Sequence, residues 1–141
     1  MNMESDTFYI SESSLLAPRI NGIYAQLIEL GFDVMLSEDE HGMPFLVVNR
    51  GERQPITIVY RYEGDEELFR YFLVALAQVD VKGMEAERLN LWNLKLKLAH
   101  IKPSGKNTLL LCASLPEYGG ISDPKNLQFF LREFSAELDS L

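Results

Sequence analysis

Residues 55–76 read PITIVYRYEGDEELFRYFLVAL, two apolar runs on either side of the acidic turn EGDEE. The first run is rich in β-branched and aromatic residues, which favour strands. The second run also fits a helix, because Leu68, Phe72 and Leu76 recur at helical spacing. We predict a strand over 68–79, because the regular spacing of polar turns continues through this segment.

Two similar runs come earlier, FDVML at 32–36 and PFLVV at 44–48, and the polar segments SEDEHG and NRGERQ separate them from their neighbours. This alternation of apolar runs and turns predicts an antiparallel meander. Before it, apolar residues follow helical spacing over 14–30, and Gly31 stands where a helix C-terminal cap belongs. Pro18 fits the first turn of a helix, so we expect the regular part of that helix to begin there.

The second half of the chain predicts a helix, a hairpin and a closing helix. MEAERLNLWN at 84–93 combines good helix formers with early acidic residues. LKLKLAHIK at 94–102 and NTLLLCASL at 107–115 read as strands joined by a Pro-Ser-Gly turn. A stripe at i, i+3, i+4 and i+7 marks the last helix, with Leu127, Phe130, Leu131, Phe134, Leu138 and Leu141. The order is helix, three or four strands, helix, two strands, helix, which is an α+β fold.

The predicted sheet is apolar on both faces. Ile56, Tyr60 and Tyr62 share one face of their strand. Thr57 and Val59 lie on the other face and leave it partly apolar. Such a sheet needs cover on two sides. Either the three helices are split between the faces, or one face meets a second subunit or a bound chain.

Composition indicates one acidic domain over 1–141, with 1–13 as a flexible tail. The 141 residues carry a net charge of −8, and 47% of them are hydrophobic. The acidic start MNMESDTF does not match a secretory signal, and no apolar run is long enough for a membrane helix, so we expect a cytoplasmic protein without a membrane partner. Binding to nucleic acid needs clustered basic residues, which the acidity opposes.

Few residues are candidates for chemistry, and we expect no enzyme, no metal and no cofactor. His41 lies in an acidic turn that lacks the alternating ligands of an EF-hand loop. Cys112, within LLLCA, is expected to be a buried apolar residue rather than a reactive thiol. His100 would face Cys112 across the second hairpin, but a nucleophile pair also needs a third, orienting group, which the sequence does not supply.

The segment EYGGISDP, Glu117–Pro124, is either an anion cradle at the start of the last helix or only a turn. Asp123 as the N-cap would occupy backbone donors with its own carboxylate, and Pro124 removes another donor. We therefore expect Gly119 and Gly120 to form a turn. A small-molecule or anion sensor that uses this segment remains the alternative function.

LNLWN at 89–93, the hairpin after it, and LPEYGGISDPKNLQFFLREFSAEL at 115–138 resemble the bacterial YbjN family. That family shares a fold group with the small acidic chaperones of type III secretion. The resemblance extends from Leu15 onward and implies the order α-β-β-β-α-β-β-α. It also implies a domain that dimerises and binds protein, without catalytic residues. YbjN proteins are often described as sensory or stress regulators.

In this family pattern Asn90 and Asn93 match the paired Asn positions, and Gly119 and Gly120 match the turn into the last helix, whereas Pro124 departs from it. Three residues apart on a helix, the two Asn share a face and are expected to bond backbone groups at the helix-to-strand junction. The leading hypothesis is a non-enzymatic protein-binding homodimer. Aromatic residues dominate protein interfaces. The candidate contact residues are Tyr60, Tyr62, Phe69, Tyr71 and Trp92.

Overall fold

The computed structural model describes residues 12–63, 70–79, 86–104, 108–116 and 124–141. The elements follow the order α2 (Glu12–Glu29), β1 (Asp33–Glu38), β2 (Pro44–Arg50), β3 (Arg53–Glu63), β4 (Arg70–Val79), α3 (Ala86–Lys95), β5 (His100–Pro103), β6 (Leu109–Pro116) and α4 (Pro124–Asp139). The α+β class predicted from the sequence is confirmed.

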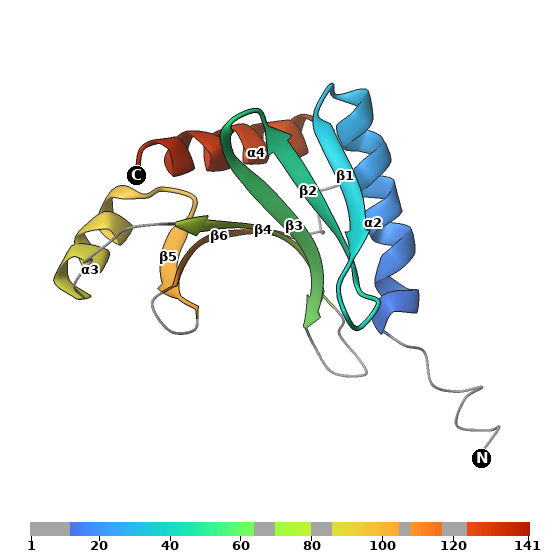
Figure 1. The fold of residues 1–141 in the computed structure, drawn as a ribbon, viewed down its shortest axis with the longest axis horizontal. Helices are drawn as coiled ribbons and strands as arrows, with labels where there is room; N and C mark the ends of the chain where they lie inside the picture. Colours follow the sequence, from blue (N-terminus) through green and yellow to red (C-terminus); the bar gives the residue numbers. More distant parts are fainter. Residues whose placement is uncertain (1–11, 64–69, 80–85, 105–107, 117–123) are drawn as a thin grey trace, which may run out of the picture.

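The six strands form one sheet in the order β1-β2-β3-β4-β6-β5, and all neighbouring strands are antiparallel. The described part of the ambiguous segment, Arg70–Val79, is a strand, as predicted, and this strand, β4, lies in the middle of the sheet between β3 and β6. Four strands therefore precede α3, one more than in the order that the family resemblance implies. The two ends of the sheet are β1 and β5, which Figure 1 shows far apart.

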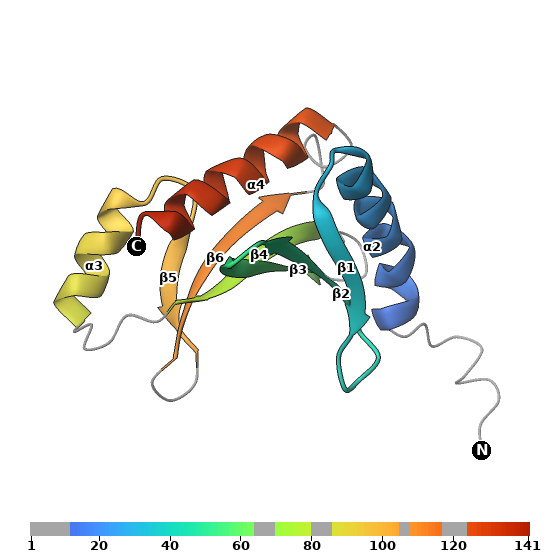
Figure 2. The ribbon, with the colours of Figure 1, turned by 45° about the horizontal axis from the view of Figure 1, so that its top comes forward.

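The three described helices lie on the same side of the sheet. In Figure 2 the sheet forms an arch with α4 above it and α2 and α3 at its ends, and none of the described helices lies beneath. The core joins one face of the strands to the helices: Ile20 and Leu27 of α2, Leu46 of β2 and Phe134 of α4 are all fully buried there. Of the two arrangements left open by the sequence, a division of the helices between the two faces is not found among the described elements.

Helix α2 ends as expected but begins earlier. Gly31 has a φ of +91°, and the N–H of Phe32 donates to the carbonyl of Leu27 at 3.0 Å, which closes the helix C-terminus. The helix starts at Glu12, so Pro18 lies inside it rather than at the start of its regular part. Leu16 is buried in the core one turn into the helix, and this burial offsets the bond that proline cannot donate.

The alternating segment 94–102 differs from the strand that its sequence predicts. Helix α3 continues to Lys95, and β5 covers only His100–Pro103. The link between them is held by the Glu137 carboxylate, which accepts the N–H groups of Lys97, Leu98 and Ala99 at 2.6, 2.8 and 2.8 Å. These donors are therefore satisfied by a side chain of α4 and not by a neighbouring strand.

Candidate protein-binding face

The sheet face opposite the helices is lined by apolar side chains. Side chains alternate between the two faces of a strand, so this face takes the positions between the core residues of β2, β3, β4 and β6. Val74 and Cys112 are buried, yet they do not belong to the helix-side core. We call the surface the open face, formed by Phe45, Val47, Thr57, Val59, Phe72, Val74, Leu76, Leu110 and Cys112.

The strand register makes the open face continuous. Val47 lies opposite Thr57, Thr57 opposite Leu76, and Leu76 opposite Cys112. Directly opposed residues on one face of a sheet have Cβ atoms about 5 Å apart, so their side chains touch. Met35 of β1 lies opposite Val47 and extends the row to the edge of the sheet, where it is 55% exposed. One apolar surface thus crosses five strands.

Cys112 lies within this face and is buried. Its burial raises the pKa of the thiol, and the positive charges of Lys102 and Arg61 lower it by less. A thiol held protonated at neutral pH reacts poorly. His100 lies opposite Cys112 in the register, as predicted, but it is solvent-exposed. The prediction of a buried, apolar cysteine is confirmed.

Tyr60 and Tyr71, two of the aromatic residues that the sequence suggested as contacts, lie on the helix side of the sheet. Tyr60 is 5% exposed and belongs to the helix-side core. Tyr71 packs edge-on against Tyr60 with ring centroids 6.2 Å apart, and the Arg19 guanidinium lies 3.6 Å from its ring centre. The side chain of Tyr62 and all of Phe69 are outside the described residues. The two described tyrosine rings therefore join α2 to the sheet.

Trp92 and the two asparagines lie on α3. Trp92 is half-buried against the core, with Lys95 Nζ 5.3 Å from its ring centre. Asn93 Oδ1 accepts the N–H of Ile101 at 2.6 Å, and its Nδ2 donates to the Ile101 carbonyl at 3.1 Å. Asn90 is exposed. Asn93 therefore pairs with a residue of β5 much as a neighbouring strand would.

The remaining predicted turn and cap residues fall on 117–123, outside the described residues. They are Gly119, Gly120 and Asp123, and the alternative anion site over Glu117–Pro124 also falls mostly on that segment. At the other acidic turn, the Asp39 carboxylate accepts the N–H groups of His41 and Met43 at 2.8 and 2.9 Å. This turn is closed by its own aspartate, a common use of Asp in turns.

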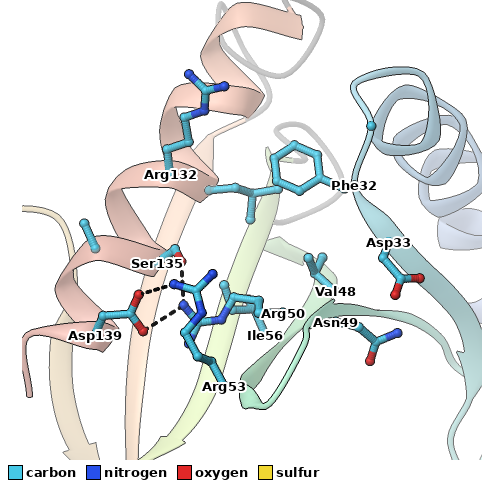
Figure 3. Close-up of a pocket in the computed structure, with 13 residues that line it drawn as sticks. Phe32, Asp33, Val48, Asn49, Arg50, Arg53, Ile56, Arg132, Ser135 and Asp139 are labelled. Carbon is cyan, nitrogen blue, oxygen red and sulfur yellow. Dashed lines mark hydrogen bonds and ion pairs between the residues drawn. The ribbon is translucent and has the colours of Figure 1, made fainter.

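A pocket of about 500 Å³ lies on the helix side, between α4 and the start of β1, and Figure 3 shows its polar end. Arg50, whose side chain is 6% exposed, donates to Ser135 Oγ at 2.5 Å and to Asp139 Oδ1 at 3.0 Å. Its Nε donates to the Gln54 carbonyl at 2.7 Å, and Arg53 donates to Asp139 Oδ2 at 2.8 Å. Each carboxylate oxygen of Asp139 thus already holds an arginine, and the cluster fixes the end of α4 to the β2–β3 hairpin.

The described part of the chain offers neither a metal centre nor a membrane helix. It contains no group of three or more His, Cys, Asp or Glu residues placed to hold a metal ion. Its helices are all too short or too polar to cross a membrane.

Sequence reasoning predicted that the sheet is apolar on both faces, but it selected single aromatic residues as the contacts instead of the residues of the open face. The sequence contained a signal for this face, because the alternating positions of 44–48, 55–62 and 70–79 are largely apolar. Each of these segments places apolar side chains on both of its faces, and only one face of each strand meets the helices.

Comparison with known proteins identifies the family. None of the curated proteins matches the chain. The family model YbjN, described as "Putative bacterial sensory transduction regulator", matches residues 20–141. This match covers every element from the middle of α2 to the end of α4 and confirms the resemblance carried by the LNLWN and EYGGISDP segments. The chain belongs to the YbjN family.

Proposed function

We propose that the chain is a non-enzymatic protein-binding domain, regulatory or chaperone-like, and that its partner docks on the open face. One observation carries the proposal: the described helices lie on one side of the sheet, and the opposite face is lined mainly by apolar side chains. A large apolar surface rimmed by polar residues is typical of an interaction site. The family description as a sensory transduction regulator is compatible with such a role.

The open face has the composition of a docking surface for a chain segment. It contains two aromatic residues, Phe45 and Phe72, and several branched aliphatic residues on rigid strands. Aromatic anchors surrounded by smaller apolar contacts supply most of the binding energy in protein interfaces. Rigid strands also limit the entropy that is lost on binding. A partner would thus gain apolar burial without reordering the domain.

The test places a photo-crosslinking amino acid at Val59 on the open face, or at Ala25, an exposed position of α2 on the helix side. We expect the Val59 variant to crosslink to a specific protein in cells of the source organism, and the Ala25 variant not to do so. The captured protein is then purified, and its binding is measured with the wild type and with Val59→Glu. Equal capture from both positions, or binding that survives Val59→Glu, would contradict the proposal.

We also propose that the domain forms a homodimer through α3. Leu91 and Leu94 are 59% and 82% exposed, and residues three apart on a helix share a face. We expect Leu91→Glu with Leu94→Glu to halve the mass measured by light scattering. Ile28→Glu on α2 is the matched control, since Ile28 is also an exposed apolar helix residue. A monomeric wild type would remove this part of the proposal.

A further inference from the structure

The described charged side chains beside the apolar centre of the open face are mainly basic. Arg61 lies opposite Phe72, His100 opposite Cys112, and Lys102 opposite Leu110. All three basic side chains are exposed. Arg61 and Lys102 therefore each lie next to a half-buried apolar residue that a bound segment would cover.

The acidic residues of these strands lie at the margins of the face. Asp33 begins β1 at the edge of the sheet, opposite Asn49. Glu63 ends β3 opposite Arg70, a basic residue, and the side chains of this pair are not described. Neither acidic residue is among the residues paired across the sheet with Leu76 or Val74.

Positive charge also lies close to Cys112, near the middle of the face. Two charges act on it, those of Lys102 and Arg61, and both are positive. This local sign is opposite to the net charge of the chain, which is −8. At physiological salt, charges act over about 8 Å, so a docked segment responds to the face and not to the distant acidic surface.

We propose that the open face binds an apolar segment of a partner protein that carries carboxylates at its ends. This inference rests on the proposed function and specifies the chemistry of the partner. The apolar side chains of the segment cover Val59, Val74 and Leu76. Its Asp or Glu residues form ion pairs with Arg61 and Lys102. Complementary charge at the rim of an interface steers the partner and sets its register.

A second copy of the chain is a poorer occupant of this face. A two-fold contact uses the same patch on both copies. Face-to-face packing would bring two positively charged faces together, and like charges across an interface oppose binding. Nucleic acid is also a poor occupant, because the floor of the face is apolar, whereas binding to phosphate backbones needs a cluster of many basic residues.

The experiment uses the full chain and three labelled peptides with one shared core of alternating valine, phenylalanine and serine. The ends of the peptides carry glutamate, glutamine or lysine, and fluorescence polarisation measures binding. We expect the glutamate peptide to bind about tenfold more tightly than the lysine peptide at low salt, since two exposed ion pairs are gained. Raising the salt to about 0.3 M should shrink this difference.

Charge-reversal variants connect the preference to the face. Arg61→Glu and Lys102→Glu should each weaken binding of the glutamate peptide and strengthen binding of the lysine peptide. The matched controls are Arg132→Glu on α4 and Lys97→Glu before β5, two exposed positions on the helix side. They make the same change in net charge and should leave the preference unaltered.

The outcomes separate the two proposals. If all three peptides bind equally and Val59→Glu weakens them, the open face binds protein but the inference about carboxylates is wrong. If none of the peptides binds, or if Val59→Glu changes nothing, both proposals fail. If Val59→Glu converts a dimer to a monomer in light scattering, a second copy occupies the face and the inference is overturned.

Discussion

Glu137 is predicted to hold the link between α3 and β5 in place. Its Oε1 accepts the N–H groups of Lys97 and Leu98, and its Oε2 accepts that of Ala99. Replacement by glutamine keeps the shape of the side chain but exchanges one carboxylate oxygen for an NH₂ group. Whichever way the amide is turned, a donor then faces a donor. At least one backbone N–H loses its partner.

The magnitude follows from the burial of these donors. The Lys97 N–H is exposed, so water replaces the lost acceptor there, whereas the other two N–H groups are partly buried. A hydrogen bond to a charged group contributes about 1.5–3 kcal/mol, and an unsatisfied buried donor costs about 1–3 kcal/mol. We expect Glu137→Gln to lower the free energy of unfolding by about 2 kcal/mol, and Glu137→Ala by about 3 kcal/mol.

Urea denaturation followed by circular dichroism measures the change. With a denaturant dependence of about 2 kcal/mol per molar urea, the Glu137→Gln midpoint should fall by about 1 M. The matched control is Glu133→Gln, one turn earlier on α4, whose side chain makes no hydrogen bond within the described part of the chain. Its free energy of unfolding should stay within about 0.5 kcal/mol of the wild type.

Amide hydrogen exchange tests the location of the effect. In Glu137→Gln, exchange should accelerate at residues 97–99 more than at the centre of the sheet, because the local bonds are lost first. The reasoning is refuted if both glutamine variants have the stability of the wild type and exchange at 97–99 is unchanged. Water would then satisfy these N–H groups as well as the Glu137 carboxylate does.

Four further predictions concern stability and reactivity. Asn93→Ala should lower the free energy of unfolding, measured in urea, by about 1–2 kcal/mol, because two hydrogen bonds to the backbone are lost. The control Asn90→Ala should lower it by less than about 0.5 kcal/mol. Equal losses in the two variants would contradict this prediction. Asp139→Ala should cost about 2 kcal/mol by thermal melting, because it leaves a buried arginine without its carboxylate, whereas Arg53→Ala at an exposed position should cost less than about 1 kcal/mol. Cys112 should resist Ellman's reagent at neutral pH until urea unfolds the chain, and labelling of the folded protein within seconds would disprove its burial. Since the folded-state pKa of Cys112 is raised above its ordinary 9.0, stability should fall as the pH rises past that value, and Cys112→Ala should remove this loss.

Periodicity along the chain predicted most of the elements. The stripe of Leu127, Phe130, Leu131, Phe134 and Leu138 is buried on α4, as its spacing indicated. Within 68–79 the described residues, Arg70–Val79, form the strand that was chosen over a helix because turns recur at strand spacing on both sides of it. These predictions succeed because local spacing reports which side chains of one element share a face.

The same reasoning did not locate the start of α2 or the short β5. Pro18 suggested a helix start, but burial of Leu16 in the core extends the helix beyond it. The alternation in 94–102 suggested a strand, but Glu137, some forty residues later, binds the backbone of its middle part. Tertiary contacts override local propensity in both cases.

Local spacing also showed that the sheet is apolar on both faces, but it could not show which face the helices cover. An amphipathic helix only needs an apolar surface, and either face offers one. The choice depends on how far each connection reaches and on contacts such as Arg50 with Asp139, which are 89 residues apart. Only the folded chain brings such residues together, and it thereby placed Tyr60 in the core and left Phe45, Val59 and Phe72 on the open face.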